Sequence, residues 1–301
     1  MKSLLSFYKE RLHLTQSQFI FIDHEDGMVS TVFKVVQPNG EEFILKICSR
    51  TGDYLREVYF LKHFADRIPT PRIVQLAPPE GDLHGAILMT CLSGRLLQIE
   101  DLSDKRMHDF GSLLARIHLD SVEGFGDLTE PDRLSQDHRI PFTKKFEEGM
   151  EECRNHLPSL LMEKCRRYYD QHVDLLLETD GPCVVHRDFR PGNLMIDNGN
   201  FQGIIDWSSA RGGFAEEDFC PLEFGEWSDN PTYKGAFLAG YASIRKVPEY
   251  KRVMPLIRLS RAIGAIGFTV KRGIWENKGA KIYRLSLQYL ESLLGREVNS
   301  L

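Results

Sequence analysis

The most constraining part of this sequence is the stretch from residue 184 to residue 207, where two apolar runs flank Asn198-Gly199. An Asn-Gly dipeptide tolerates the positive φ angles that a tight hairpin turn requires. The pattern therefore predicts a strand, a short polar loop and then a β-hairpin. Three polar residues, Asp188, Asn193 and Asp206, stand where the predicted strands stop.

Folding this hairpin about its turn brings its two open ends together. Asn193 then faces Asp206 to within about two residues of register, because neighbouring strands lie only about 5 Å apart. Asp188 precedes Asn193 on the same polar loop. One carboxylate beside an Asn/carboxylate pair fits a general base next to a Mg²⁺ site. The alternative is a surface hairpin whose acidic residues are simply solvated.

Composition excludes several other classes of protein. The chain has 301 residues, enough for two lobes with separate cores. A net charge of −5 without a dense Lys/Arg run argues against nucleic-acid binding. Six scattered cysteines form no Cys-x-x-Cys pair, which argues against zinc and favours free thiols in a reducing compartment. A charged N-terminus and the lack of a long apolar run predict a cytoplasmic protein that does not bind membranes.

Residues 1–92 have the pattern of a β-rich N-terminal lobe. A turn at Asn39-Gly40 favours an antiparallel meander within the first fifty residues or so. Ser93-Gly94 follows the last apolar strand and marks a hinge, after which residues 93–301 form a second lobe. The elements expected in the first lobe are helices 3–14 and 53–64 and strands 19–23, 32–36, 42–48, 73–76 and 86–92.

Residues 93–301 read as a larger, mainly helical lobe. The helical periodicity of apolar residues is clear in this part of the chain, and Ser103 or Asp104 is a suitable N-cap for its first helix. The whole chain is therefore expected to be a bilobal α+β protein with a ligand site between its lobes. The helices expected here are 104–119, 142–157, 160–177, 216–224, 232–244, 256–270 and 280–294.

A lysine and a glutamate of the first lobe form a second candidate pair. Lys46 lies among apolar residues of a predicted strand, and Glu57 lies in the middle of the following helix. Together they would form an ion pair that could steady the lysine against a nucleotide, although an edge lysine with its ammonium in solvent fits equally. The loop at Gly27 has a single glycine, so it reads as either a phosphate-binding loop or a plain turn.

These features occur in an order that resembles the protein-kinase-like superfamily, and specifically the aminoglycoside phosphotransferase family of small-molecule kinases. The order is Lys46, Glu57, a hinge, and then His186-Arg187-Asp188 with Asn193 and Ile205-Asp206. The resemblance covers roughly residues 19–224 and is most specific at the catalytic loop. It implies a protein-kinase-like fold and transfer of a phosphoryl group from ATP or GTP to a small molecule.

The resemblance also implies a role for each matching residue. Asp188 would be the catalytic base, and Asn193 with Asp206 would hold Mg²⁺ against the phosphates. Lys46, held by Glu57, would contact the α- and β-phosphates. The remaining implied nucleotide contacts are Ser30 and Thr31 in the loop over the phosphates, Thr90 and Leu92 through backbone groups, and Met89 just before the hinge.

Two departures from related patterns narrow this assignment. Many family members have glycine at the position of Arg187, so His186-Arg187-Asp188 has the form found in protein kinases. Protein kinases, however, continue after the metal-binding Asp with Phe-Gly and a segment ending in Ala-Pro-Glu. Here Asp206 is followed by Trp207-Ser208, and Ala-Pro-Glu does not occur. The acceptor is therefore expected to be a small molecule, and His186 a structural residue.

The acceptor itself is not fixed by these motifs. Seven acids against one base, Arg211, occur between residues 206 and 230, and an acidic wall would attract a polyamine such as an aminoglycoside antibiotic. The same acids fit a solvated helix face, and Asp218 fits a structural helix residue. Choline, homoserine and sugar kinases share this machinery, and a catalytically silent nucleotide-binding protein is a further alternative. The acids are Asp206, Glu216, Glu217, Asp218, Glu223, Glu226 and Asp229.

Overall fold

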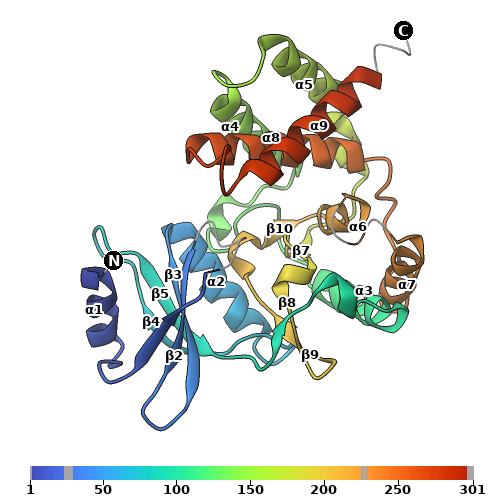
Figure 1. Ribbon diagram of the computed structural model, residues 1–301. Helices are drawn as coiled ribbons and strands as arrows, with labels where there is room; N and C mark the ends of the chain where they lie inside the picture. The colour runs from blue at the N-terminus through green and yellow to red at the C-terminus, as the bar shows by residue number, and fades with distance from the viewer. Residues whose placement is uncertain (1, 24–29, 225–226, 228–229, 297–301) are drawn as a thin grey trace.

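The computed structural model describes residues 2–23, 30–224, 227 and 230–296. Figure 1 shows a smaller N-terminal region built around a β-sheet and a larger region that is mainly helical. The predicted bilobal α+β architecture is confirmed. None of the helices that the structure describes is both long and apolar enough to cross a membrane.

The N-terminal region contains a five-stranded antiparallel sheet in the order β1-β2-β3-β5-β4. The expected turn between β2 and β3 contains Gly40, whose φ of 86° is favourable for glycine. The predicted meander is therefore confirmed. The strands are β1 (Gln18–Phe21), β2 (Ser30–Val36), β3 (Glu42–Cys48), β4 (Ile73–Ala77) and β5 (Gly85–Thr90).

Side chains of the central strand β3 alternate between two covered faces. Leu45 packs in a cluster with Tyr8 of α1 (Lys2–Arg11), whereas Lys46 points to the other face, toward α2 (Thr51–Phe64). Because β3 lies between β2 and β5, Lys46 is not on a sheet edge, and the residue is only 7% exposed. The interpretation of Lys46 as a solvent-reaching edge lysine is therefore wrong.

The C-terminal region is built from two groups of helices. Helix α3 packs closely on α7, where Gly240 is required because a Cβ atom there would lie 1.8 Å from the His108 carbonyl oxygen. Helices α4, α5, α8 and α9 form a second group farther from the sheet (Figure 1). The helices are α3 (Asp104–His118), α4 (Arg139–Cys153), α5 (Ser159–His172), α6 (Cys220–Phe224), α7 (Pro231–Ala242), α8 (Met254–Lys271) and α9 (Ala280–Arg296).

Short strands between these helices carry the predicted hairpin. Strands β8 and β9 pair about Asn198 and Gly199, whose φ values of 47° and 81° confirm the predicted turn. Strand β6 adds to this hairpin, while β5 belongs to the N-terminal sheet, so we propose Leu92 as the end of the first lobe. The strands are β6 (Arg95–Leu96), β7 (Cys183–Val185), β8 (Leu194–Asp197), β9 (Asn200–Ile204) and β10 (Arg211–Gly213).

Candidate active site

The β8–β9 hairpin brings Asn193 and Asp206 to its open end. Leu194 pairs with Ile204, and the Ile205 N–H donates to the Asn193 carbonyl at 2.9 Å. Asp206 is therefore one residue beyond the position opposite Asn193, within the predicted register. A φ of 62° at Asp206 turns the chain sharply out of β9 and into the short helical turn Trp207–Ser209.

Asn193 also fixes the side chain of Asp188. Its Nδ2 donates to Asp188 Oδ2 at 2.7 Å and to the Asp188 carbonyl at 2.8 Å. The Asp188 side chain remains 40% exposed, and its Oδ1 accepts a bond from Arg190 Nε at 3.1 Å. The loop thus holds an accessible carboxylate in a defined orientation, which is the geometry that a base requires.

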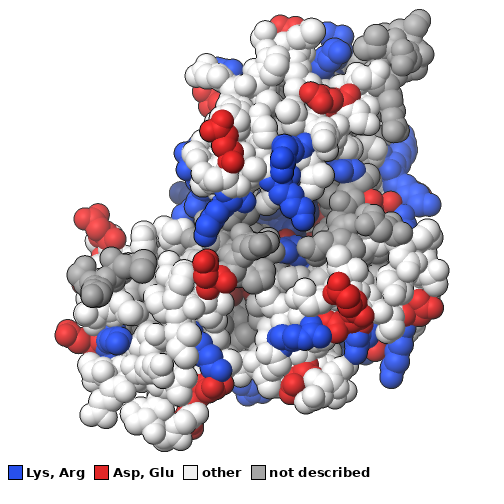
Figure 2. Space-filling model, in the orientation of Figure 1, with Lys and Arg blue, Asp and Glu red and all other residues white. Residues whose placement is uncertain are grey.

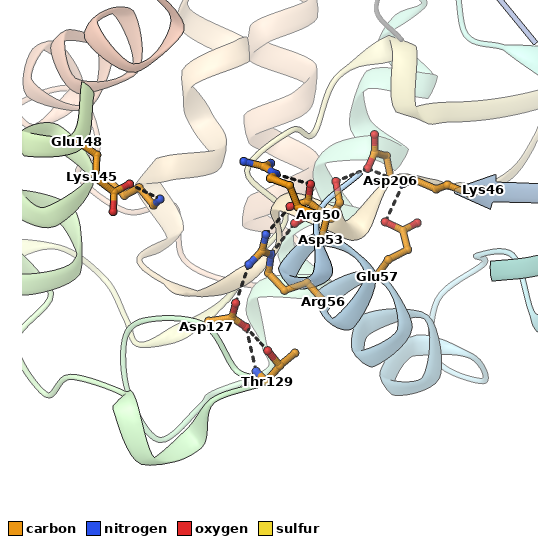
Figure 3. Close-up of polar contacts among 11 residues, drawn as sticks. Lys46, Arg50, Asp53, Arg56, Glu57, Asp127, Thr129, Lys145, Glu148 and Asp206 are labelled. Atoms are coloured by element: carbon orange, nitrogen blue, oxygen red, sulfur yellow. Dashed lines mark hydrogen bonds and ion pairs between the residues drawn. The ribbon is translucent and has the colours of Figure 1, made fainter. Parts of the chain in front are cut away.

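Lys46 connects the two lobes through an ion-pair network that we call the interlobe network, made of Lys46, Glu57 and Asp206. Its ammonium donates to Glu57 Oε2 on α2 and to Asp206 Oδ1 beyond β9, both at 2.9 Å (Figure 3). Ser208 Oγ donates to the same Asp206 oxygen at 2.7 Å. Residues 160 positions apart thereby meet at one nitrogen atom.

Burial and charge set the protonation of the interlobe network. Burial raises the pKa of Glu57 to about 7, although the Lys46 ammonium acts in the opposite direction. Desolvation opposes the charge on Lys46, but the Asp206 and Glu57 carboxylates outweigh it and raise the Lys46 pKa. Desolvation likewise opposes ionisation of Asp206, yet the Lys46 ammonium and the Ser208 hydroxyl lower its pKa well below the usual range. Lys46 is therefore charged, and Asp206 balances it.

Asn193 and Asp206 each keep one oxygen that suits a metal ion. Asn193 uses Nδ2 toward Asp188, which turns its carbonyl oxygen Oδ1 away from that bond. Asp206 binds Lys46 and Ser208 through Oδ1, and its side chain is 42% exposed. Within the described residues neither Asn193 Oδ1 nor Asp206 Oδ2 accepts a hydrogen bond. Mg²⁺ commonly takes one or two protein oxygens and completes its shell with phosphates and water, so this pair fits it.

Two of the nucleotide contacts predicted in the first lobe, Ser30 and Thr31, differ from the prediction in their secondary structure. Ser30 and Thr31 are the first residues of β2, paired with Cys48 and Ile47, so they lie on a strand and not in a loop as expected. The loop at Gly27 lies outside the described residues. The strand begins earlier than predicted because β3 provides pairing partners along its whole length.

The hinge residues lie at and beyond the end of β5. Met89 is buried within the strand, and Thr90 is its last residue. The Thr90 N–H donates to the Arg72 carbonyl at 2.9 Å, so an adenine contact through this N–H would compete with that bond. Leu92 packs against Gly203 of the hairpin, where a Cβ atom would lie 2.8 Å from Leu92 Cδ1.

Several residues that sequence reasoning missed hold α2 against the second lobe. Arg56 donates through separate nitrogens to Asp53 and to Asp127, each at 2.6 Å (Figure 3). Its Nε donates to the Ser208 carbonyl, also at 2.6 Å. Trp207 stacks on Phe64 of α2 with ring centroids 4.7 Å apart. The spacing of three between Asp53 and Arg56 is typical of an ion pair within a helix, so the sequence could have indicated that pair. The other partners of Arg56 are distant in sequence.

The acids between residues 206 and 230 correct the expectation of an acidic wall. Glu216, Glu217 and Asp218 are 1–2% exposed, so they form neither a wall nor a solvated helix face. Asp218 accepts from the backbone N–H groups of His186 and Arg187, and also bonds His118 at 3.1 Å. The interpretation of Asp218 as structural is therefore supported. Glu226 and Asp229 lie outside the described residues.

Glu217 completes what we call the loop-support network, made of His118, Arg187, Arg211, Glu217 and Asp218. It accepts from Arg187 Nε and Arg211 Nη2, both at 2.9 Å. Arg187 has a φ of 68°, a conformation that glycine adopts easily and that an arginine needs support to keep. Asp218 and Glu217 supply that support to its backbone and side chain. Arg187 therefore anchors the loop that carries Asp188.

His186 packs under the same loop. It is fully buried, and its ring lies 4.6 Å from that of Trp207. Its Nδ1 accepts from the Asp188 N–H at 3.3 Å, and burial lowers its pKa, which keeps the ring neutral at pH 7. These contacts favour the structural role that the sequence suggested.

Comparisons with known proteins agree with this geometry. The profile of the phosphotransferase enzyme family matches residues 22–256, which is more than half of the chain. No curated protein matches the chain. Solved structures match it over nearly its whole length at low sequence identity, which establishes a shared fold.

Three solved structures illustrate that similarity. A thermostable mutant of aminoglycoside phosphotransferase APH(4)-Ia, in complex with AMP-PNP and hygromycin B, has a TM-score of 0.70 and 15% identity over 95% of this chain and 97% of its own. The gentamicin complex of APH(2")-IIa has a TM-score of 0.65 and 16% identity, covering 95% of each chain. ADP-bound APH(2'')-Ib has a TM-score of 0.60 and 15% identity, covering 97% of this chain and 96% of its own.

The family match extends across both lobes and includes every residue of the interlobe network, Asp188 and Asn193. The shared fold places an antiparallel sheet region beside a helical region, as the geometry here does. The chain therefore belongs to the phosphotransferase enzyme family, and it has the protein-kinase-like fold of the aminoglycoside phosphotransferases.

Proposed function

We propose that this protein transfers the γ-phosphoryl group of ATP to a hydroxyl of a small molecule in the presence of Mg²⁺. The observation that supports this most is the interlobe network, in which Lys46 of the sheet bonds both Glu57 and Asp206 at 2.9 Å. Phosphoryl transfer depends mainly on alignment and charge neutralisation, and a cation beside a half-exposed carboxylate supports both.

In this proposal Asp188 orients the acceptor hydroxyl and accepts its proton. Its carboxylate is held by Asn193 and Arg190 and remains 40% exposed, so a hydroxyl can approach it. The proton moves from the acceptor oxygen to Asp188 as that oxygen forms a bond to the γ-phosphorus and the bond to the β-phosphate oxygen breaks. ADP leaves with the electrons of the broken bond.

Lys46 donates to the α- and β-phosphates in this proposal, and Glu57 keeps its ammonium in place. Asn193 Oδ1 and Asp206 Oδ2 are the atoms that would hold Mg²⁺. When bound, the ion supplies positive charge that neutralises the phosphate oxygens. We assign Ser30 and Thr31 to the phosphate side, and Met89, Thr90 and Leu92 to the adenine side of the same site.

Two measurements test this function. Nucleotide binding with and without Mg²⁺ is expected to show metal-dependent affinity, which Asp206→Ala abolishes. ATP- and GTP-dependent ADP or GDP release, screened over aminoglycosides, amino alcohols, amino acids and sugars, is expected to exceed the acceptor-free rate and to vanish in Asp188→Ala. Aminoglycosides belong in this panel because similar structures bind hygromycin B and gentamicin. Tight Mg-ATP binding without phosphorylation of any acceptor would instead identify a silent nucleotide-binding protein.

A further inference from the structure

The loop that carries Asp188 contacts an arginine of α8, Arg261. Arg261 Nη2 donates to the carbonyl of Arg187 at 2.7 Å, and the next residue in the chain is Asp188. Burial opposes the charge on Arg261, but nearby acidic groups that include Asp188 raise its pKa. A permanent positive charge therefore lies within electrostatic reach of the carboxylate that we propose as the base.

Arg261 retains unused hydrogen-bonding capacity. A guanidinium group has five N–H donors. Within the residues that the structure describes, the Arg261 side chain makes one hydrogen bond, to the Arg187 carbonyl. Arg261 as a whole is partly exposed. A planar guanidinium of this kind suits a carboxylate or a phosphate, which it can bind through two N–H groups.

The connection between α8 and α9 carries further positive charge at the mouth between the lobes. Figure 2 shows Lys and Arg side chains along the edge of the helical region that overlooks the central hollow. The exposed cations of this segment, which we call the basic rim, outnumber its one acid, Glu276. Lys278 lies 3.7 Å from Asp23, which follows β1, so this segment contacts the N-terminal region. The basic rim consists of Lys271, Arg272, Lys278, Lys281 and Arg284.

Acidic partners offset part of this charge, since Glu152 pairs with Lys271 at 2.8 Å and Asp23 lies 3.7 Å from Lys278. Glu217 and Asp218 are buried beneath the loop and bonded within the loop-support network. The positive rim occurs although the chain as a whole has a net charge of −5, so it is a local feature and not a property of the composition. A cationic rim concentrates anions and repels polyamines at the entrance to a cleft.

We propose that the acceptor is a hydroxylated small molecule that carries an anionic oxygen group, a carboxylate or a phosphate, which Arg261 binds beside Asp188. This inference rests on the proposed phosphotransferase function and narrows its substrate class. The basic rim steers the anion inward, and Arg261 holds it so that a hydroxyl lies against Asp188.

A matched series of three-carbon diols tests the binding step. Glycerol, glycerate, glycerol phosphate and aminopropanediol share a diol and differ in charge. Each is titrated by calorimetry or ligand-observed NMR into the protein saturated with Mg²⁺ and AMP-PNP, which fills the phosphate positions. We expect the two anions to bind at least about tenfold more tightly than glycerol, because each gains a charge-assisted bond. Comparing glycerate with glycerol phosphate identifies which anion the site prefers.

Variants of Arg261 assign that preference to the residue. Arg261→Met is expected to remove the preference for anions, and Arg261→Lys to retain part of it. Arg154→Met is the matched control, since Arg154 is exposed and pairs with Glu151 on α4. If Arg261→Met fails to fold, two other variants still test the anion preference. They are Arg261→Lys and a surface double variant that combines Lys281→Glu with Arg284→Glu. The double variant is expected to weaken anion binding about threefold or more at low salt, and not at about 0.5 M KCl.

Three results would overturn the inference: tighter binding of aminopropanediol or an aminoglycoside than of the anions, an unchanged anion preference in Arg261→Met, or no binding of either anion. Phosphorylation of the same series separates this inference from the proposed function. Arg261-dependent anion binding without transfer to any acceptor would leave the anion site standing and remove the kinase proposal. Phosphoryl transfer confined to neutral or cationic acceptors would support the kinase proposal and remove the anion site.

Discussion

The interlobe network and the loop-support network contain similar residue types but have different surroundings. Each holds two carboxylates beside basic side chains. In the loop-support network the side chains of Glu217 and Asp218 are at most 3% exposed, and each of their oxygens accepts a bond. In the interlobe network the Asp206 side chain is 42% exposed. Its Oδ1 accepts the bonds from Lys46 and Ser208, and its Oδ2 takes no part in them. An accessible oxygen, and not the number of charges, therefore distinguishes the network that we propose to bind a ligand from the one that supports the loop.

The largest expected effect of a single change within these networks is on stability, from Asp218→Asn. The amide nitrogen cannot accept from a backbone N–H, so the change leaves a buried donor of the loop without a partner. Breaking a buried charged network in this way costs about 3–5 kcal/mol. Urea unfolding measures the loss, with Asp206→Asn as the matched control. Because Asp206 is half-exposed and Lys46 keeps its bond to Glu57, the Asp206 variant is expected to lose less stability than the Asp218 variant. Equal losses in the two variants would contradict the comparison.

Lys46→Met is expected to act in the opposite way, with a large effect on catalysis and a small one on folding. Removing a cation that neutralises phosphates lowers the turnover number about 10²–10³-fold, as loss of one transition-state donor does elsewhere. Folding is less affected, because Glu57 can take up a proton when its partner is lost. Steady-state ADP release and thermal unfolding give the two values. Less than a tenfold loss of turnover would show that Lys46 has only a structural role.

The pH dependence of stability gives a third test, through Glu57. Its folded-state pKa is raised to about 7 from an ordinary 4.5, so the fold favours the protonated form. The unfolded chain loses this proton at lower pH than the folded protein does, and stability therefore falls as pH rises from about 4.5 through 7. The difference amounts to about 3 kcal/mol. Comparing the free energy of unfolding of the wild type and Glu57→Gln from pH 5 to 8 isolates this contribution. A constant difference would show that Glu57 does not titrate in this range.

The sequence predicted the hairpin and its polar residues well because their positions follow from local rules. Asn198-Gly199 determines the turn, and strand pairing then brings Asn193 and Asp206 together. Residues that depend on distant partners were harder to identify. Arg56 contacts Asp127 and Ser208 only after both lobes have folded. These residues are far apart in the sequence, so no local sequence pattern predicts the contacts.

The buried acids show the same limit more sharply. Glu217 and Asp218 resemble surface acids in composition, but the loop and Arg211 enclose them. Net charge along a segment does not tell which side chains face solvent, so the sequence could not decide between an acidic wall and a structural cluster. The structure shows that these residues are buried, and the charge that we propose to select the acceptor is instead that of Arg261.

The smallest effect is expected where the two networks meet the catalytic loop, at Arg187. Arg187→Ala and Arg187→Gly both remove the bond to Glu217, while Arg211 continues to pair with that carboxylate. Only glycine also relieves the φ of 68°. We therefore expect the glycine variant to be more stable than the alanine variant by about 1 kcal/mol, as measured by urea unfolding. Equal stability would mean that the bonds from Asp218 to the loop N–H groups hold this conformation without measurable backbone strain. In that case the support of the loop, and not the identity of residue 187, determines how Asp188 is presented.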